Sequence, residues 1–420
     1  MEKSFASLLT LLPECQCEVK TLVKGAAYFG VKTEDIRRAA AALPENHDLK
    51  YKGVRLLLSA CLEEFTALFS DEKRERCEVS VPAPPFVMYA LQQAGADWQF
   101  ASGAFFAQIV LRGILLCREP LSINSCAKRR CGLNIMRQKI ICQPPEKEIR
   151  RQLQFGLLCD ECVKVGETLK DRAECISVSF PKQAPKAVLA DMTEAFLHQV
   201  CDSLGIVLGP EHTKQAFRTY SRLMKAENAL LRLNGRPDRL PLYGNSLALA
   251  QSVQIMTPDH PDRFLLALET LTEEMNDAPP SEEKRRMYSF FVPFLQPEID
   301  VRFRKNGVFL LGNAAFLQQG KHMGIDLPGM TAAWLSSMNI RKDIKGECAG
   351  IAEAMERCGC RDYLTGFFGF DRWLGANTPL QRKILHQQYG KTVKTLDADF
   401  WCENAMFGSV LNRIDLMCLK

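Results

Sequence analysis

The sequence has little histidine and lacks the common nucleotide-binding motifs. Its six histidines are scattered over 420 residues, without a Ser-His-Asp set or a His-x-x-x-His spacing. Neither a G-x-x-x-x-G-K-[ST] loop nor a convincing G-x-G-x-x-G turn after a predicted strand is present. These absences argue against a hydrolase, a zinc protease and a chain that hydrolyses nucleotides itself.

Neither sign of charge is in large excess. The chain has 54 Lys and Arg against 49 Asp and Glu, which gives a net charge of +5. Two short basic runs, Lys128–Arg130 and Lys284–Arg286, are most simply solvent-exposed, and an anionic ligand such as a CoA phosphate is the alternative. The charge pattern therefore predicts no nucleic-acid partner.

Long apolar runs are also missing. The most apolar stretch, Gly103–Cys117, is interrupted by Gln108 and Arg112 and is too short to span a bilayer. The N-terminus has a short apolar core broken by polar residues, and no small-residue cleavage site follows, unlike a signal peptide. We therefore expect a soluble, cytoplasmic protein with no membrane partner.

Cysteine, in contrast, is abundant. Seventeen cysteines cannot all pair with one another, and they favour a reducing compartment in which some serve as ligands. Between Ser122 and Leu169, two pairs are spaced as Cys126-x4-Cys131 and Cys159-x2-Cys162. By number, four thiolates suit a [4Fe–4S] cluster or a tetrahedral zinc ion equally well, and buried core thiols are the plainer alternative. We predict that these four cysteines bind a metal or cluster.

The pattern of apolar residues divides the chain into four parts. Residues 1–75 have helical periodicity, residues 76–186 alternate strand and helix, residues 187–283 are again helical, and residues 284–420 form a second α/β part. The strand candidates are Cys77–Val81, Trp98–Ala101, Phe155–Leu158, Glu174–Phe180, Met287–Val292, Gly307–Leu311, Tyr363–Phe370 and Thr392–Leu396. Strands separated by helices predict parallel sheets. The expected fold class is α/β, with two parallel-sheet domains, an N-terminal helical segment and a helical middle region.

Short motifs occur in a characteristic order along most of the chain from about residue 77. They are the proline-led helix Pro85–Gly95, the segment Ser125–Arg129, the sequence Leu158-Cys159-Asp160 after an apolar strand, and the sequence Asn412–Asp415 in the last predicted helix. In this order and spacing, the chain resembles subunits of the 2-hydroxyacyl-CoA dehydratase and benzoyl-CoA reductase family, such as the 2-hydroxyglutaryl-CoA dehydratase D-component.

The resemblance implies two Rossmann-like α/β domains with a [4Fe–4S] cluster held by cysteines between them. Cys126 and Cys159 match the family's ligand positions, whereas Cys131 and Cys162 are supported by spacing alone. The family implies a lyase or reductase subunit of an oxygen-sensitive enzyme that pairs with a related subunit as a homodimer or heterodimer. A separate ATP-dependent iron–sulfur activator would supply one electron for the reduction of a CoA-thioester substrate.

The chain departs from the family pattern at two expected cysteines. No cysteine follows the strand candidate Gly307–Leu311. A further cysteine sometimes follows the next-to-last strand in the family, and the segment Phe368–Asp371 has phenylalanine instead. Two alternatives therefore stay open. The first is a non-catalytic partner subunit of the same fold with a partial cluster site. The second is a structural protein stabilised by zinc on four cysteines.

Overall fold

The structure is a computed structural model of the whole chain. It describes residues 1–28, 30–69, 74–80, 82–101, 151–157, 166–167, 169–280, 285–290, 297–312, 314, 325–366, 372–397 and 407–419. The four predicted ligand cysteines lie outside these residues.

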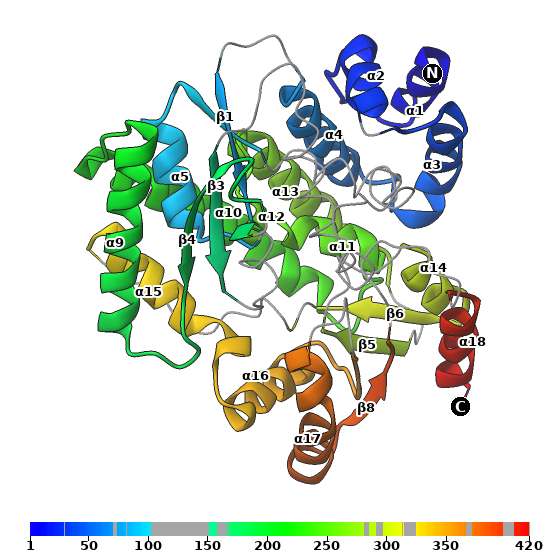
Figure 1. Cartoon of the computed structure of the whole chain (residues 1–420). Helices are drawn as coiled ribbons and strands as arrows, with labels where there is room; N and C mark the ends of the chain where they lie inside the picture. The colour runs from blue at the N-terminus through cyan, green and yellow to red at the C-terminus, as the bar shows by residue number, and fades with distance from the viewer. Residues whose placement is uncertain are drawn as a thin grey trace.

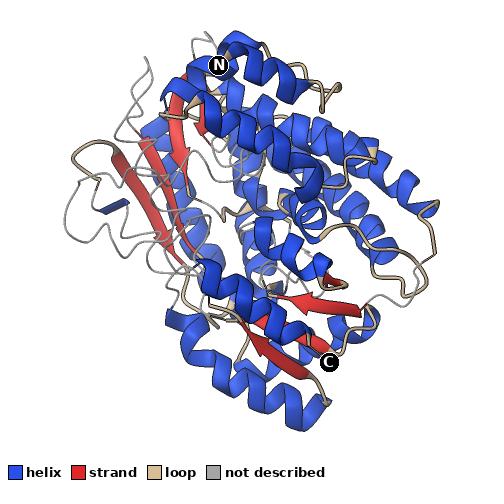
Figure 2. Cartoon of the chain, turned by 90° about the vertical axis from the view of Figure 1, so that its right-hand side faces the viewer, coloured by secondary structure: helices blue, strands red, loops and turns tan. Residues whose placement is uncertain are grey.

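Two four-stranded sheets are described, and every strand pair in them is parallel (Figure 2). The first sheet has the order β2-β1-β3-β4 and contains β1 (Glu75–Val79), β2 (Trp98–Ala101), β3 (Arg151–Gly156) and β4 (Glu174–Ser179). The second has the order β6-β5-β7-β8 and contains β5 (Arg285–Ser289), β6 (Val308–Leu311), β7 (Asp362–Thr365) and β8 (Thr392–Thr395). Both sheets thus follow the same strand order along the chain. The expected fold class, α/β with two Rossmann-like parallel-sheet units, is confirmed.

Each strand predicted from the sequence overlaps an observed strand, and the ends differ by a few residues. The largest difference at the start of a strand is at β3, which begins at Arg151 instead of Phe155, and the largest at an end is at β7, which ends at Thr365 instead of Phe370. Gln152 and Gln154 alternate there with Leu153 and Phe155, and the two glutamines are nevertheless buried. Their side chains are hydrogen-bonded to each other, and Gln152 also donates to the carbonyl oxygens of Gly166 and Ala173, which permits their burial. The apolar run alone therefore placed the start of the strand too late.

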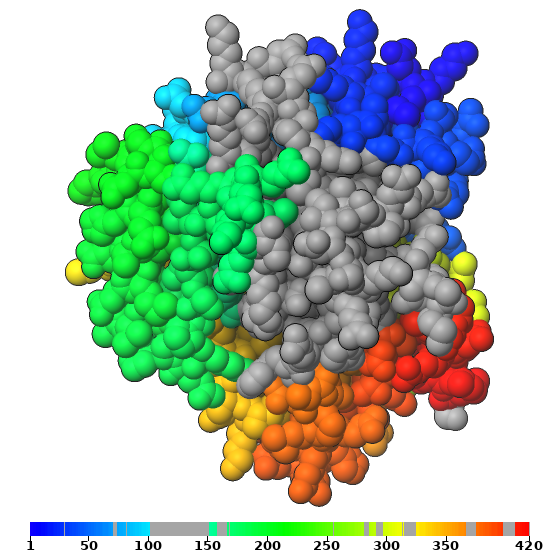
Figure 3. Space-filling model, viewed as in Figure 1, coloured from blue at the N-terminus to red at the C-terminus, as the bar shows by residue number. Residues whose placement is uncertain are grey.

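Helices surround the sheets and fill the space between them. They are α1 (Glu2–Leu9), α2 (Val19–Tyr28), α3 (Thr33–Asn46), α4 (Lys52–Ala67), α5 (Pro85–Ala94), α9 (Lys186–Leu204), α10 (Pro210–Asn234), α11 (Gly244–Gln251), α12 (Val253–Met256), α13 (Pro261–Asn276), α14 (Pro297–Lys305), α15 (Leu327–Ser337), the 3-10 helix η4 (Asn339–Arg341), α16 (Ile344–Arg357), α17 (Arg372–Tyr389) and α18 (Phe407–Cys418). None of these described helices combines the length and apolar character needed to cross a bilayer. The N-terminal helices and the C-terminal elements lie at opposite ends of the face shown in Figures 1 and 3.

The crossing of α4 and α13 is central to the helical core. Apolar residues at helical spacing form a buried face of α4 that continues one residue past its end, and they are Val54, Leu57, Leu58, Cys61, Phe65 and Leu68. The two backbones meet at Gly53, where an added Cβ atom would lie 2.4 Å from Leu271 Cβ. Next to this contact, the Glu274 carboxylate accepts hydrogen bonds of 2.8 Å from the N–H groups of Lys52 and Gly53. A side chain of α13 therefore caps the start of α4.

Helix α15 connects the two sheet units. It follows β6 in the chain, yet it packs against α9 and α5 beside the first sheet (Figure 1). Its Trp334 side chain is fully buried. The ring centroids of Phe155 on β3 and Phe196 on α9 lie 5.0 Å apart, which joins the same helical layer to the sheet. A segment that follows the first strands of the second sheet thus covers part of the first one.

Candidate functional site

The carboxyl edge of the first sheet has the geometry of a ligand-binding edge. The strand order reverses between β1 and β3, because β2 lies beyond β1 on one side and β4 lies beyond β3 on the other. At their carboxyl ends, the buried Ser80 hydroxyl accepts a hydrogen bond of 2.8 Å from the Phe155 N–H. Open parallel sheets bind ligands outside the carboxyl ends of the strands at such a reversal. We therefore place the candidate site at this edge.

One buried cation lies at the same edge. Arg341, in η4, is 5% exposed, and its guanidinium donates hydrogen bonds to the carbonyl oxygens of Leu157 at 2.9 Å and Pro181 at 2.7 Å. Burial lowers the pKa of Arg341 to about 10. Among the residues that the structure describes, no carboxylate lies within 4 Å of its guanidinium. Its positive charge at the ends of β3 and β4 is therefore not cancelled by a described acidic side chain.

A buried carboxyl group lies close to this arginine in the chain. Glu347 is in the first turn of α16, whose start is fixed by Asp343, since the Asp343 side chain accepts a 2.7 Å hydrogen bond from the Gly346 N–H. One Glu347 oxygen, Oε1, accepts a hydrogen bond of 2.9 Å from Gln381 of α17. The other, Oε2, is buried and has no hydrogen-bond partner among the described residues. This oxygen is available to a ligand or a water molecule.

The protonation of Glu347 is shifted toward neutral pH. Burial raises its pKa from the ordinary value of 4.5 to about 7, against the opposing effects of the Lys182 charge and the Gln381 hydrogen bond. Lys182 follows β4 of the first sheet, whereas Glu347 belongs to the helix before β7 of the second. Helices that precede a parallel strand run antiparallel to it, so the first turn of α16 lies toward the carboxyl edge of the second sheet. The charge of Lys182, which follows a strand of the first sheet, thus acts on a carboxyl group at the carboxyl edge of the second.

One face of the first sheet carries an unusual row of polar side chains. The register aligns Arg76 with Gln99 and Glu78 with Gln152 on neighbouring strands, and all four residues are buried. The row continues at Gln154, whose side-chain N–H donates a hydrogen bond of 2.7 Å to the Gln152 side chain. Because parallel sheets are usually apolar on both faces, this row of buried polar side chains departs from the usual pattern.

The predicted ligands Cys126, Cys131, Cys159 and Cys162 lie outside the described residues, so their mutual positions stay a prediction. The last described residue before Cys159 is Leu157, the residue that Arg341 contacts. Within the described part of the chain, no group of three or more His, Cys, Asp or Glu side chains is placed so that it could hold a metal ion. The ten cysteines in that part are free thiols.

The carboxyl end of β6 is where the family pattern expects a third cysteine. Gly312 occupies this end with a φ of +77°, and a Cβ atom there would lie 2.1 Å from the Tyr288 ring. Both the backbone conformation and the close contact require glycine. The next described residue, Ala314, is buried. The structure therefore gives a physical reason for glycine at this position, and no described cysteine stands beside it.

Sequence reasoning missed Arg341, Glu347 and the row of polar residues on the first sheet. Arg341 and Glu347 are single charged residues in amphipathic segments, and they lack a motif. Their positions depend on contacts across more than 150 residues of the chain, as in the hydrogen bond from Arg341 to Leu157. The polar row was detectable in principle, because Arg76-Cys77-Glu78 and Gln152-Leu153-Gln154 both alternate polar and apolar residues.

Comparison with known sequences identifies no family for this chain. No protein-family model matches it, and no curated protein matches it at a significant level. The resemblance described from the motifs therefore stands as a proposal.

Proposed function

We propose that the chain is the iron–sulfur subunit of an oxygen-sensitive 2-hydroxyacyl-CoA dehydratase or benzoyl-CoA reductase-like enzyme. The observation that carries this proposal is the end of β3. This strand borders the reversal of strand order in the first sheet, and Cys159 follows its last residue, Gly156, by three positions. Short connections after rigid strand ends are where α/β proteins hold ligands and cofactors.

Two further features support an anionic metal cluster at this edge. The described part of the chain contains two parallel sheets, as the resemblance implies, and their strand orders are identical. The buried Arg341 guanidinium contacts the carbonyl oxygen of Leu157, two residues before Cys159, and it would stabilise a cluster whose four thiolate ligands bring negative charge. Cys126 and Cys159 would hold the cluster, with Cys131 or Cys162 as further ligands. When bound, a [4Fe–4S] cluster supplies one-electron reduction chemistry.

Glu347 is suited to exchange a proton in such a reaction. A carboxyl group with a pKa of about 7 is partly protonated under cellular conditions, and this is the property of an efficient general acid or base. Loss of a 2-hydroxyl group as water requires one proton. We propose that Glu347 holds this proton, with Gln381 orienting its carboxyl group and Lys182 limiting the rise of its pKa.

A second candidate function is favoured by the carboxyl end of β6. Gly312 cannot be replaced by cysteine without moving the Tyr288 ring, and the segment Gly312–Phe316, where the family pattern expects a cysteine, contains none. A non-catalytic partner subunit, which keeps the fold for pairing with a related subunit and has only a partial cluster site, would have this property. Whether the isolated chain binds iron separates the two candidates.

Iron binding by cysteine variants tests the proposal. The chain is purified under anaerobic conditions as the wild type and as the variants Cys126→Ser, Cys159→Ser and Cys201→Ser. Cys201 lies on α9, away from the carboxyl edge, and serves as the matched control. We expect the first two variants to lose most of their iron and sulfide and the control to keep both. Equal iron in all four proteins would refute the ligand assignment.

A further inference from the structure

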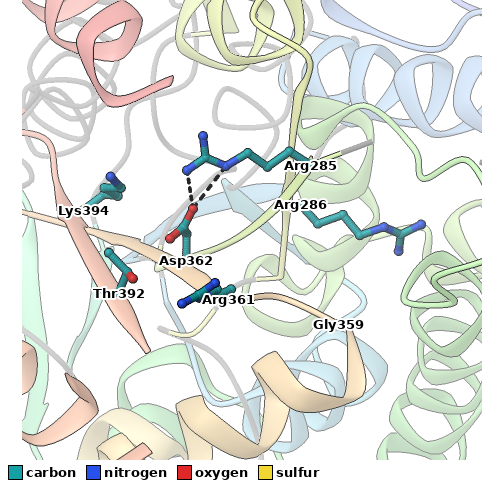
Figure 4. Close-up of a pocket in the computed structure, with 7 residues that line it drawn as sticks. All are labelled: Arg285, Arg286, Gly359, Arg361, Asp362, Thr392 and Lys394. Carbon is teal, nitrogen blue, oxygen red and sulfur yellow. Dashed lines mark hydrogen bonds and ion pairs between the residues drawn. The ribbon is translucent and has the colours of Figure 1, made fainter. Parts of the chain in front are cut away.

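A cavity of about 490 Å³ opens at the amino-terminal edge of the second sheet. Its lining residues are Arg285, Arg286, Gly359, Arg361, Asp362, Thr392 and Lys394 (Figure 4). Arg285, Asp362 and Thr392 are the first residues of β5, β7 and β8. The cavity is therefore at the edge opposite to the carboxyl ends that carry the proposed function, and its chemistry needs a separate account.

The charges that line this cavity do not balance. Four cationic side chains and one carboxylate give the lining a formal charge of +3. The carboxylate is already used, because Asp362 Oδ2 accepts a hydrogen bond of 3.2 Å from Arg285 Nε. Within the described ranges, neither Arg361 nor Lys394 has a carboxylate within 4 Å. Figure 4 shows both side chains on the same side of β5 as the Arg285–Asp362 pair.

Arg286 adds a positive charge that is held in place by neutral groups. Its guanidinium points away from Arg285 and donates hydrogen bonds to the backbone carbonyl oxygens of Gly235, Pro237 and Arg239 (Figure 4). The residue is only 8% exposed, so the expectation that the run Lys284–Arg286 is simply solvent-exposed is wrong for this arginine. Carbonyl oxygens orient a guanidinium without cancelling its charge. Arg286 therefore raises the positive potential of the cavity.

The lining also indicates the chemistry of a ligand. Among the described residues, it contains no aliphatic or aromatic side chain. It does contain the guanidinium group of Arg361 and the ammonium group of Lys394, neither of which has a described carboxylate partner, and the hydroxyl group of Thr392. Guanidinium and ammonium groups of this kind are the usual partners of phosphate oxygens.

We infer that this cavity binds the phosphate groups of a small phosphorylated molecule, with Arg361 and Lys394 as its direct ligands. The site is independent of the proposed cluster, since it lies on the other edge of the second sheet and contains none of the predicted ligand cysteines. Asp362 lowers the affinity for phosphate, because it neutralises Arg285 and places one negative charge in the lining.

Isothermal titration with inorganic pyrophosphate, at constant ionic strength, tests this inference. The proteins are the wild type, the double variant Arg361→Gln/Lys394→Gln, and the control Lys214→Gln/Arg222→Gln. The control removes the same two charges at exposed ion pairs with Glu211 and Asp262, outside the cavity. We expect saturable binding at one site in the wild type and in the control, and binding weaker by at least about ten-fold in the cavity variant.

A second cavity variant is expected to bind pyrophosphate more tightly, and misfolding could not produce such a gain in affinity. Asp362→Asn keeps a hydrogen-bonding side chain beside Arg285 but removes the negative charge, so we expect pyrophosphate to bind several-fold more tightly. Citrate is titrated in parallel as a polyanion without phosphate. Equal affinity for citrate, equal weakening in the control, or no saturable binding to the wild type would each overturn the inference.

Discussion

The guanidinium of Arg341 donates a hydrogen bond of 2.9 Å to the carbonyl oxygen of Leu157, a residue 184 positions earlier in the chain. The same guanidinium reaches the carbonyl oxygens of Phe180 and Pro181. One side chain from the segment before α16 thus contacts the residues that directly follow two neighbouring strands of the first sheet. The residues that follow β3 and β4 are thus joined by a side chain that belongs to neither strand.

Replacing Arg341 with methionine should therefore destabilise the junction of the two sheets. The carbonyl oxygens of Leu157 and Pro181 would lose their donor in a buried position, at a cost of about 1–3 kcal/mol for each unsatisfied group. Urea unfolding measures this cost as a lower midpoint. Arg357→Met is the control, because Arg357 pairs with Glu353 on the exposed side of α16. If both variants unfold at the same midpoint, the contact has no stabilising role.

The raised pKa of Glu347 predicts a particular dependence of stability on pH. The folded protein holds a proton on this group up to about pH 7, whereas the unfolded chain releases it near the ordinary value of 4.5. Stability contributed by this group is thus complete below pH 4.5 and is lost as the pH rises through about 7. With 1.36 kcal/mol for each pKa unit, the loss amounts to up to about 3 kcal/mol.

The Glu347→Gln variant should lack this loss, because its amide does not ionise. We expect the free energy of unfolding of the wild type to fall relative to that of the variant between pH 5 and pH 8. Glu353→Gln, an exposed change on the same helix, should follow the wild type. A constant difference between wild type and Glu347→Gln over this pH range would show that Glu347 has an ordinary pKa.

The crossing of α4 and α13 predicts a strong effect of a single methyl group. In Gly53→Ala, the new Cβ atom would lie 2.4 Å from Leu271 Cβ and 2.5 Å from the Leu271 backbone nitrogen, so the two helices must separate. We expect a loss of about 1–3 kcal/mol in the free energy of unfolding. Gly408→Ala, in the first turn of α18, has open space around it and should be neutral or slightly stabilising. The prediction is wrong if the two variants melt alike.

Single serine variants of Cys131 and Cys162 distinguish the possible ligand sets of a cluster. If the chain supplies all four ligands, each variant should retain clearly less iron than Cys201→Ser after anaerobic purification, because a four-thiolate site loses affinity with each missing ligand. Iron retained in both variants, together with iron lost in Cys126→Ser and Cys159→Ser, would assign the remaining ligands to other residues of this chain or to a partner subunit.

Much of the fold could be predicted from local patterns. The strands β2 and β4 were located almost to the residue, and the buried face of α4 from Val54 to Leu68 follows directly from helical spacing. The parallel pairing followed from the alternation of strands and helices. The packing of α15 on α9 could not be predicted, because it joins segments more than 100 residues apart and because α15 is buried on nearly every side, so its sequence does not single out one contact face.

The candidate site was predicted less completely, for a related reason. Cysteine spacing draws attention to Cys126 and Cys159, whose chemistry can be recognised from residue type alone. Arg341 and Glu347 gain their properties only from burial: the same side chains on an exposed helix would have ordinary pKa values and no specific partner. Burial of a single charged residue is set by the tertiary fold, and no local pattern encodes it.

The most direct test of the proposed function is elemental analysis of the wild-type chain. The protein is purified under anaerobic conditions, and its iron, acid-labile sulfide and zinc are measured together with the visible absorption spectrum. The account predicts a brown protein that contains iron and sulfide in equal amounts. Its visible absorption should fade when the protein is exposed to air. Zinc without sulfide would contradict it in favour of a structural four-cysteine site, and a protein without metal would contradict it in favour of a non-catalytic partner subunit.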